Sequence, residues 1–418
     1  MGVRLPDRCQ VAVVGAGIVG LACAHALVQR YPDLRGVVLE KEPEVGLHQT
    51  SHNSGVVHAG IYYRPGSLRA RLCLEGARRM RAFCEAHGLP FQAVGQVIVA
   101  TEERELPRLE ELLRRGQANG VPGLRWLRAE ELREVEPHAA GLAALHSPAT
   151  AITDFRQVAL TLAKLLGASG TAVVTGCALL GARRRPEGFE LRTSRGLLLA
   201  RSVLNCAGLH SDRVARSLGA RPGVRIVPFR GEYYLLRPER RHLVRGLIYP
   251  VPDPQLPFLG VHLTRTVHGE VEAGPNAVVA WAREGYRPWA FRLQDAWETV
   301  SYSGFWGLAR RYWRVGLYEQ IRSWSLREFA RSVRRLLPEV QDRDLQRVGC
   351  GVRAQAVAPD GSLVDDFRVV LQPGAVHVLN APSPAATAAL AIGDHVAELA
   401  SEVLGLEATP RAKSALGS

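Results

Sequence analysis

Residues Thr50 to Tyr63, TSHNSGVVHAGIYY, combine two histidines and two tyrosines with small polar residues and carry no Asp, Glu, Lys or Arg. Histidine can accept and return a proton near neutral pH, because its unperturbed pKa is about 6.5. Small residues allow a ligand to approach the backbone closely. We therefore expect this stretch to contact a bound molecule, and the residues before it indicate which kind.

The segment before this stretch has the form of a dinucleotide-binding turn. An apolar strand at 10–14 runs into Gly15-Ala16-Gly17-Ile18-Val19-Gly20, and an apolar helix follows to about residue 30. Gly15 permits the tight turn, Gly17 lets a pyrophosphate approach the backbone, and Gly20 lets the helix pack closely on the strand. The pyrophosphate would lie at the helix N-terminus, where unpaired N–H groups favour negative charge.

A second short strand, residues 36–39, ends at Glu40. From this position a carboxylate accepts both hydroxyls of an adenine ribose, so an acid here indicates an unphosphorylated ribose. A GxGxxG run alone is weak evidence. Strand, glycines, helix, second strand and terminal acid in this order together predict a dinucleotide site.

The rest of the chain predicts that the cofactor domain is discontinuous. A polar helical excursion follows residue 95, and a strand at 198–204 later returns the chain to Asn205-Cys206-Ala207-Gly208. Alternating apolar runs between 224 and 345 predict an antiparallel sheet, and residues 289–337 predict helices.

We predict a mixed α/β fold with two domains. The ranges are 1–94, 150–222 and 345–408 for a Rossmann-like cofactor domain, 95–149 and 223–344 for a substrate domain that faces a membrane, and 409–418 for a flexible tail.

Length and charge set outer limits. A chain of 418 residues can hold two cores, since one core rarely exceeds about 300 residues. The formal net charge is +13, and of 53 basic residues only Lys41, Lys164 and Lys413 are lysines. A basic protein can attract nucleic acid, anionic membrane or an acidic substrate. We expect no nucleic-acid partner, because the chain has neither a nucleic-acid motif nor a basic low-complexity arm.

Cysteine spacing and hydropathy exclude further classes. The seven cysteines show no CxxC pair and no metal-ligand spacing, which predicts free thiols and no metal site. We find no apolar run of about 18 residues that would form a transmembrane helix. The nine residues before the first strand are too few for a presequence.

Several runs of residues resemble the L-2-hydroxyglutarate dehydrogenases, a family of the D-amino-acid-oxidase-like FAD superfamily. They are GAGIVG with Glu40-Lys41, HQTSHNSGVVHAGIYY, RIVPFRGEYYLL, LIYPVPDPQLPFLGVHLT, GPNAVVAWAREGY, GVRAQA and NAPSPAATAALAIG. The resemblance extends from about residue 10 to 400 and is greatest to the mitochondrial animal enzymes. It therefore implies a mitochondrial protein associated with the inner membrane.

The resemblance implies noncovalent FAD and oxidation of L-2-hydroxyglutarate to 2-oxoglutarate, by hydride transfer from C2 to flavin N5. It also implies that a quinone-type acceptor receives the electrons. Such a reaction requires a hydride acceptor held over C2, a base for the hydroxyl proton and cations for two carboxylates. The expected partners are a small dicarboxylate and a quinone, and the oligomeric state stays open.

The resemblance also implies which residues hold FAD. The segment after Glu40 would pass along the cofactor to the flavin ring, and Val174 would contact adenine through its backbone. A turn at 382–385 would aim N–H groups and a helix N-terminus at the flavin, unless it is an ordinary helix cap. The expected set is Gly15, Gly17, Ile18, Gly20, Glu40, Lys41, Thr50, Ser51, His52, Asn53, Ser54, Val174, Ala207, Gly208, Pro382, Ser383, Pro384 and Ala385.

Three histidines are candidates for the general base, namely His58, His262 and His52. Each could instead be a structural histidine or a flavin contact. Tyr62 is expected near the substrate, and Tyr249 and Asn276 are expected as polar neighbours.

Two arginines are candidates for binding the carboxylates. Arg353 in GVRAQA is favoured, because the planar guanidinium matches a carboxylate bidentately. The alternative is an ion pair with Asp365 or Asp366 or a place on the surface. Arg230 in PFRGEYY is the weaker candidate, since it could serve the strand that joins the domains.

Residues 289–337 interleave aromatic residues with arginines, the types that settle at a lipid headgroup boundary. They are Trp297, Phe305, Trp306, Tyr312, Trp313, Trp324 and Phe329 with Arg310, Arg311, Arg314, Arg322, Arg327 and Arg331. This pattern predicts peripheral membrane contact. In the alternative, the aromatic residues pack a helical core and the arginines face solvent.

Two other functions remain open at this stage. An amino-acid or amine oxidase on the same scaffold would release hydrogen peroxide and oxidise amines. A peripheral membrane module with structural FAD would bind flavin that no hydroxy acid or amino acid reduces.

Overall fold

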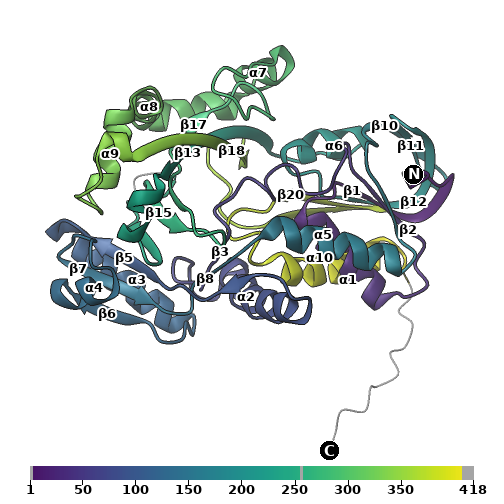
Figure 1. Ribbon diagram of the computed structural model, residues 1–418. Helices are drawn as coiled ribbons and strands as arrows, with labels where there is room; N and C mark the ends of the chain where they lie inside the picture. The colour runs from purple at the N-terminus through teal and green to yellow at the C-terminus, as the bar shows by residue number, and fades with distance from the viewer. Residues whose placement is uncertain (1–2, 255–257, 407–418) are drawn as a thin grey trace, which may run out of the picture.

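The computed structural model of the protein describes residues 3–254 and 258–406, so the tail predicted at 409–418 lies outside the described residues. Two large sheets occupy the two halves of the molecule, the first at the right of Figure 1 and the second at the left. Helices pack on both sheets. The predicted mixed α/β fold is confirmed.

The first sheet has a parallel centre with antiparallel edges. Its path is β10-β11-β12-β1-β2-β9, with β20 beside β12 and β19 beside β20. β1 pairs in parallel with both β12 and β2, as expected for a Rossmann-like unit. The strands are β1 (Arg8–Val14), β2 (Gly36–Leu39), β9 (Ala172–Val174), β10 (Leu179–Arg185), β11 (Gly188–Thr193), β12 (Gly196–Asn205), β19 (Arg368–Gln372) and β20 (Ala375–Asn380).

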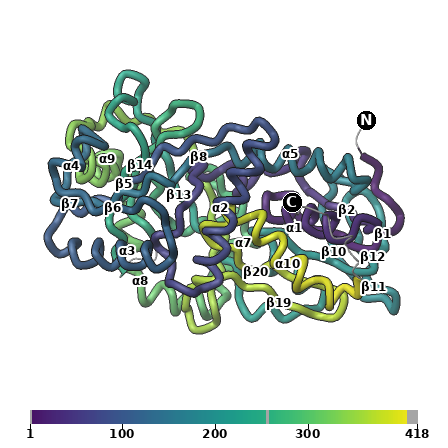
Figure 2. Tube along the Cα trace, turned by 90° about the horizontal axis from the view of Figure 1, so that it is seen from below, coloured from purple at the N-terminus to yellow at the C-terminus, as the bar shows by residue number. Residues whose placement is uncertain are grey.

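Helices cover the first sheet because successive residues of a strand point to opposite faces. Val11 and Val13 of β1 pack in the core formed with α1 (Ile18–Arg30), α5 (Phe155–Ala168) and α10 (Ala389–Val403), whereas Ala12 and Val14 pack on the other side. That side is covered by α6 (Ser211–Ser217) together with the β10–β11 hairpin. Figure 2 shows α2 (Leu68–Ala86) beside α10.

The second sheet has the path β17-β13-β16-β15-β14-β5-β7-β6, with β18 beside β13. Residues 95–149 were predicted as a helical excursion, and they do form two helices, α3 (Leu106–Ala118) and α4 (Ala129–Val135). The same residues also form β5, β6 and β7, which belong to the second sheet. The strands are β5 (Gln96–Ala100), β6 (Arg125–Arg128), β7 (Ala143–Ser147), β13 (Arg225–Leu236), β14 (Leu247–Pro250), β15 (His262–Arg265), β16 (Val271–Gly274), β17 (Val278–Val279) and β18 (Leu345–Val357).

One predicted domain boundary does not match the observed strand pairing. The chain was expected to re-enter the cofactor domain at residue 345, but β18 pairs antiparallel with β13 from Leu345 to Val357. Such a long ladder makes residues 345–357 part of the second sheet, and the chain returns to the first sheet with β19. β3 (Val56–Val57), β8 (Ala151–Thr153) and β4 (Phe91–Gln92) form a separate small sheet, and Figure 1 shows β3 and β8 between the two halves of the molecule.

The predicted helical region 289–337 forms three helices, α7 (Leu293–Val300), α8 (Ser303–Trp324) and α9 (Leu326–Arg334). α8 is kinked at Tyr312, whose backbone is not helical. The helices follow a bent segment in which Trp281 bridges to Phe291. In Figure 1, α7 and α8 lie along β13 and β18, on the side away from α2 and α3.

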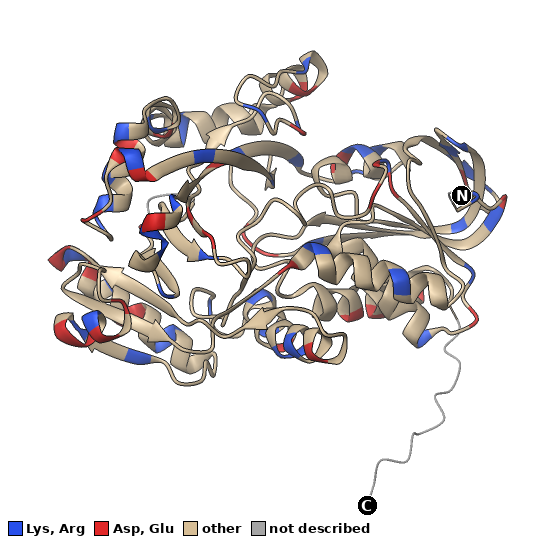
Figure 3. Ribbon diagram, in the orientation of Figure 1, with Lys and Arg blue, Asp and Glu red and all other residues tan. Residues whose placement is uncertain are grey.

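Basic residues are distributed over both halves of the molecule, with acidic residues among them (Figure 3). Within the described ranges, none of the helices is both long enough and apolar enough to cross a lipid bilayer.

Candidate active site

A cavity of about 890 Å³ lies where β1, β2 and β12 end, between the first sheet and the second. Such a crevice outside the carboxyl ends of parallel strands is the usual ligand site of an α/β sheet. The segments that line it are 14–20, 39–41, 46–50, 206–210, 353–355 and 381–387, together with single residues of other elements.

The glycine turn forms the nucleotide end of the cavity. Gly15 has a φ of +105°, and a Cβ there would lie 2.6 Å from the carbonyl oxygen of Cys206. A Cβ on Gly20 would overlap the carbonyl oxygen of Gly15. The nearest described atom to a Cβ on Gly17 is Thr50 Oγ1, at 3.5 Å, so Gly17 alone of the three borders open space. This division of roles is the one the sequence predicted.

Polar groups fix this turn against its neighbours. Glu40 is buried, and its carboxylate accepts hydrogen bonds from Ala16 N (2.8 Å) and Glu42 N (3.0 Å). A carboxylate has about four acceptor positions, so Glu40 can still accept from a ribose. Thr50 Oγ1 accepts from Ile18 N at 3.0 Å. Gly17, the N-cap of α1, has no side chain of its own, so apart from the Thr50 hydroxyl the first turn of the helix borders the cavity directly.

Most of the expected cofactor residues line the cavity. These are Gly15, Gly17, Ile18, Gly20, Glu40, Lys41, Thr50, Asn53, Ser54, Ala207, Gly208, Pro382, Ser383, Pro384 and Ala385.

Three expected cofactor residues are placed elsewhere. The Ser51 hydroxyl bonds to the Gly46 carbonyl. His52 stacks on Tyr286 with ring centroids 4.3 Å apart. The carbonyl of Val174 accepts from Glu40 N, because β9 continues the sheet beside β2, and Cys177 and Ala178 line the cavity near it instead.

The turn at 382–385 borders the cavity, but α10 begins later, at Ala389. Ala385 N donates to Pro382 O and Ala388 N donates to Pro384 O, each at 2.9 Å. These two N–H groups therefore bond within the turn, and α10 begins only four residues after Ala385, although Thr387 still lines the cavity.

His58 borders the other end of the cavity, which we call the substrate end. Its backbone N–H donates to Thr387 Oγ1 at 3.1 Å, whereas its buried Nδ1 has no hydrogen-bond partner among the described residues. Burial lowers the pKa of His58 to about 4, with smaller contributions from His262 and Arg69. His58 is therefore a neutral imidazole at pH 7 and can accept a proton.

His262 and Tyr249 lie behind this wall and do not line the cavity. Their ring centroids are 4.0 Å apart, and His262 Nδ1 bonds to Gly260 O at 2.9 Å. Burial lowers the pKa of His262 to about 4, and Arg353 lowers it further against the opposing effect of the Gly260 carbonyl. Burial raises the pKa of Tyr249, whose hydroxyl bonds to Ser54 and Thr264.

Arg353 faces the cavity, as predicted for a carboxylate-binding residue. Its guanidinium lies over the ring of Phe258, 4.7 Å from the centroid. Burial lowers the pKa of Arg353, Tyr233 opposes this effect, and Arg69 adds to it. Within the described ranges Arg353 has no carboxylate within 4.0 Å, so the predicted alternative of an ion pair with Asp365 or Asp366 is wrong.

The structure places Arg230 and Asn276 away from the cavity. Strand alternation puts Arg230 and Glu232 of β13 on one face, and Arg230 Nη2 bonds to Glu232 Oε1 at 3.1 Å. Arg230 Nη1 donates to Pro288 O at 2.8 Å. Asn276 donates to Glu232 Oε2 at 3.2 Å, so both residues hold a buried carboxylate.

Tyr62 also lies outside the cavity lining. Its hydroxyl accepts a hydrogen bond from Gln96 Nε2 at 3.0 Å, and burial raises its pKa well above the ordinary value.

Sequence reasoning missed Arg69, which lines the substrate end from the first turn of α2. Its Nε donates to Ser383 O at 2.7 Å and its Nη1 to Asp365 O at 2.9 Å. RPGSLRARL contains no motif that distinguishes Arg69 from the other arginines of the chain. Tertiary packing alone identifies it.

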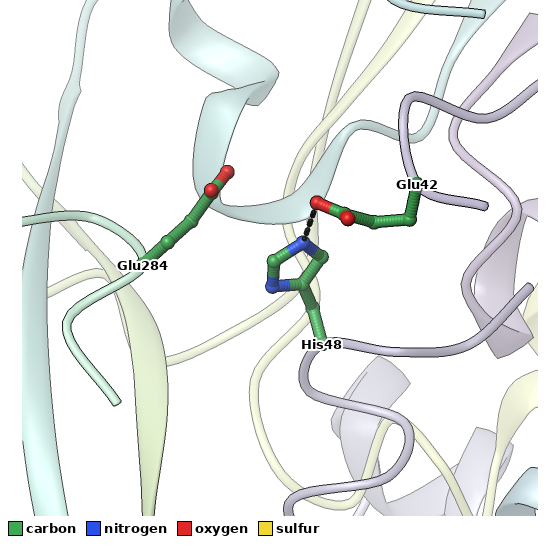
Figure 4. Close-up of side chains that lie close together, drawn as sticks. All are labelled: Glu42, His48 and Glu284. Carbon is green, nitrogen blue, oxygen red and sulfur yellow. Dashed lines mark hydrogen bonds and ion pairs between the residues drawn. The ribbon is translucent and has the colours of Figure 1, made fainter. Parts of the chain in front are cut away.

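A charged cluster at the nucleotide end was also missed. Side-chain nitrogen and oxygen atoms of Glu42, His48 and Glu284 lie close together. His48 Nε2 bonds to Glu42 Oε1 at 2.9 Å (Figure 4). Lys41 Nζ contacts Glu42 and lies 2.8 Å from Glu284 Oε1, while His210 Nε2 lies 2.6 Å from the same oxygen. Lys41 thus offsets one of the two negative charges, and His48 and His210 hydrogen-bond to the carboxylates.

The chain matches the family described as FAD dependent oxidoreductase over residues 10–399. L-2-Hydroxyglutarate dehydrogenase of Indibacter alkaliphilus is 46% identical over 392 residues, which cover 94% of this chain and 98% of that protein. The Escherichia coli K12 protein of this name is 43% identical, and the match covers 95% of this chain and 94% of that protein. The mitochondrial Homo sapiens protein is also 43% identical, with coverages of 93% and 88%.

Solved structures share the fold at low sequence identity. L-α-glycerophosphate oxidase of Mycoplasma pneumoniae with FAD bound has a TM-score of 0.78 and 20% identity, and the match covers 97% of this chain and 96% of that one. L-proline dehydrogenase of P. horikoshii has a TM-score of 0.72 and 17% identity, with coverages of 95% and 94%.

The residues of the cavity fit FAD. Gly17 leaves space for a pyrophosphate beside the first turn of α1, Glu40 can receive a ribose, and the cavity volume suits a large cofactor. The enzyme is therefore an FAD-dependent oxidoreductase, as predicted. By this match and by its relatives, the chain belongs to the FAD dependent oxidoreductases and, among them, to the L-2-hydroxyglutarate dehydrogenase family.

Proposed function

We propose that this enzyme oxidises L-2-hydroxyglutarate to 2-oxoglutarate and passes the electrons to a quinone-type acceptor. Relatives that are 43–46% identical bear the name of this dehydrogenase. The observation that carries the proposal is the pairing, in one cavity, of a neutral histidine with an arginine that has no carboxylate partner in the described chain.

Each group has a separate task in this reaction. Bound FAD supplies the two-electron acceptor for the hydride that leaves C2. The guanidinium of Arg353 binds the carboxylate beside C2 and so orients the substrate. His58 accepts the hydroxyl proton as the C2–O bond becomes a carbonyl. The hydride and the proton together account for the two hydrogens lost between the hydroxy acid and the keto acid.

His58 is the favoured base among the three candidate histidines. It lines the cavity, whereas His262 is bonded to Gly260 O and lies behind the wall. His52 stacks on Tyr286 outside the lining. Loss of a positioned general base lowers a rate by about 100- to 10,000-fold, so these assignments are open to measurement.

Anaerobic mixing of the holoenzyme with L-2-hydroxyglutarate, its D enantiomer, L-malate and a panel of amino acids tests the reaction. Oxidised flavin absorbs at about 450 nm, a general property of the cofactor. We expect rapid bleaching by the L enantiomer and not by the others. Bleaching by an amino acid with hydrogen peroxide release in air would favour an amine oxidase, and flavin that no compound reduces would favour a structural cofactor.

The same proposal includes contact with a membrane, where a quinone would be met. On α8 after its kink, Trp313, Leu317, Ile321 and Trp324 follow at spacings of three or four residues and are all exposed. That spacing puts them on one face of the helix. Trp289 and Trp297 near α7 are 85% and 67% exposed. Phe305 and Phe329 instead pack in the core, so the predicted alternative holds for these two aromatic residues.

Arginines accompany this aromatic surface. Arg310, Arg311 and Arg314 are exposed on α8. Exposed tryptophans with arginines suit an anionic lipid surface, where rings sit at the headgroups and guanidinium groups meet phosphates. We therefore propose peripheral contact through residues 289–324 with anionic lipid.

Flotation with vesicles that contain anionic lipid tests this contact. The variant Trp306→Ser, Trp313→Ser, Trp324→Ser should lose most of its vesicle binding. A matched control, Leu142→Ser, Leu197→Ser, Leu371→Ser, changes apolar side chains that are exposed on other elements and should bind as the parent does. Equal binding by both folded variants would exclude the proposed surface.

The mitochondrial location expected from the resemblance is not distinguished by the relatives, because bacterial and mitochondrial proteins are about equally similar to this chain. Imaging of the full-length protein in its own cells, with and without organelle fractionation, would decide between the two locations.

A further inference from the structure

We infer that Arg69 is the second carboxylate-binding residue of the substrate end and that it binds the carboxylate distant from the reacting carbon. The inference rests on the proposed function, which gives Arg353 the carboxylate beside C2. Arg69 thereby replaces Arg230, the weaker of the two arginines that the sequence offered for the carboxylates.

The position of Arg69 is fixed by close packing of α2 on the turn before α10. A Cβ on Gly76 would overlap Ala388 Cα and lie 2.8 Å from Thr387 O, so only glycine allows this approach. Ser67 caps the helix by accepting from Ala70 N at 3.2 Å. Arg69, in the first turn, is thereby held beside Ser383 at the cavity wall.

The guanidinium of Arg69 is oriented but not neutralised. It lies over the ring of Tyr63, 4.7 Å from the centroid, and its Nε and Nη1 donate to the carbonyls of Ser383 and Asp365. These carbonyls carry no net charge. In the described ranges Arg69 has no carboxylate within 4.0 Å, and its Nη2 makes no hydrogen bond.

Two cations that have no carboxylate within 4.0 Å in the described chain therefore line the same cavity, together with His58. Arg69 lowers the pKa values of both Arg353 and His58, as a positive charge in the same cavity would. Like charges in a poorly solvated site repel one another, and a bound dianion removes that repulsion while it pairs with both. The arrangement suits a dicarboxylate better than a monocarboxylate.

Three other arginines do not meet these conditions, and Arg292, which also lines the cavity, is exposed at the N-cap of α7. Arg230 is paired with Glu232, and Arg213 is paired with Asp295 and Glu298. Arg216, which also lines the cavity, is paired with Asp212. Arg69 differs from all three because it lines the substrate end and retains an unbalanced charge.

A purely structural role is the competing explanation, since the two carbonyl bonds fasten α2 to the 382–385 turn. Such a role would affect all ligands of the substrate end alike and would lower FAD content or thermal stability. A role in reading the distal carboxylate would affect only ligands that have one. Two keto acids with the same head group, 2-oxoglutarate and 2-oxopentanoate, separate these outcomes because the second lacks the distal carboxylate.

The test measures binding of both keto acids to the oxidised holoenzyme through the change in flavin absorption, with no turnover. We expect Arg69→Met to weaken 2-oxoglutarate binding by at least about 30-fold, the cost of removing one partner of a buried charge pair. Binding of 2-oxopentanoate should stay nearly constant. Arg69→Lys should restore part of the loss, and Arg71→Met, which changes an exposed arginine of the same helix, should have no effect.

An equal loss for both keto acids, or no loss for either, would overturn the inference, as would a preference for 2-oxoglutarate that survives Arg69→Met. FAD content and melting temperature are measured for each variant, and Arg69→Lys serves if the methionine variant does not retain FAD. Failure of the proposed function gives a different result: L-2-hydroxyglutarate would not bleach the flavin, whereas a dianion preference that depends on Arg69 would still be measurable.

Discussion

The two ends of the cavity are built in opposite ways. The nucleotide end is built around one continuous segment, residues 14–50, which is joined by residues 177–181 and 206–217, and it depends on where side chains are missing or already paired. The substrate end combines His58, Arg69, Phe258, Arg353 and Ser383 from distant parts of the chain. Backbone geometry therefore decides the first end, and individual side chains decide the second.

The two ends also differ in whether their charged and polar groups are paired. At the nucleotide end Glu40 accepts two backbone hydrogen bonds and Lys41 is paired with Glu42 and Glu284. At the substrate end His58 Nδ1 and the guanidinium of Arg353 have no partners of this kind in the described chain. Paired groups build a site that stands without a ligand, whereas unpaired groups build one that a ligand completes.

The largest effect is expected at the substrate end, from His58→Gln. The amide cannot accept the hydroxyl proton, so flavin reduction by L-2-hydroxyglutarate should slow by about 100- to 10,000-fold. Glutamine keeps the polar character of the side chain, so FAD content should be retained. Stopped-flow absorbance at about 450 nm measures the rate, since oxidised flavin absorbs there.

The pH profile of the parent enzyme sharpens this prediction. The pKa of His58 is lowered from 6.5 to about 4, so the neutral, proton-accepting form persists down to that pH and is lost below it. The acid limb of kcat/KM, which reports the free enzyme, should lie near pH 4 rather than 6.5. His262→Gln, the matched control behind the wall, should lower the rate much less. A larger effect from His262 would move the base to that residue.

A smaller effect, a weaker binding of FAD, is expected at the nucleotide end from Gly17→Ala. The added methyl group would point into the open space beside Thr50, where the pyrophosphate is expected. Overpacking costs about 1–3 kcal/mol, which corresponds to about 5- to 150-fold in the Kd for FAD. Gly17 has a φ of −72°, which alanine adopts readily, so the FAD-free protein should keep its melting temperature.

Gly20→Ala provides the contrasting control for this prediction. Its methyl group would overlap the carbonyl oxygen of Gly15 inside the protein, so it should lower the melting temperature even without FAD. If both alanine variants destabilise the FAD-free protein equally, Gly17 does not border the cofactor space.

The nucleotide end could be predicted from sequence because its signal is local. The strand, turn and helix at residues 8–30 follow from apolar pattern and glycine spacing alone. The second sheet was harder, because the short strand β5 pairs at Gln96 with Ser147 of β7 and with Leu247 of β14, both far along the chain. β18 was assigned to the wrong sheet, since its residues do not reveal that they pair with β13.

The substrate end could be predicted in part. Arg353 and His58 were found through their place in recognisable runs of residues, but Arg230 was chosen where Arg69 faces the cavity. Arg230 and Glu232 stand two apart on one strand, a spacing that places them on the same face and allows them to pair. Arg69 reaches the cavity because Gly76 lets α2 approach the 387–388 backbone, a contact between segments more than 300 residues apart.

The smallest effect is expected from Glu284→Gln, which tests whether a distant segment helps the nucleotide end to retain FAD. Glu284 lies between β17 and α7, yet its carboxylate meets Lys41 Nζ at 2.8 Å and His210 Nε2 at 2.6 Å beside the cavity. His210 and Lys41 hold the pKa of Glu284 well below its ordinary value of 4.5. The pair is therefore intact above that pH and weakens only as the carboxylate is protonated in acid.

About a third of the Glu284 side chain is exposed, so solvent screens the pairs and their contribution stays within about 1 kcal/mol. FAD should leave Glu284→Gln faster by less than about fivefold, and the difference should shrink in high salt. Glu44→Gln, which breaks a surface pair with Arg156, is the matched control and should release FAD as the parent does. A Glu284 effect that exceeds that of Gly17→Ala would mean that a distant segment, rather than the glycine turn, chiefly retains the cofactor.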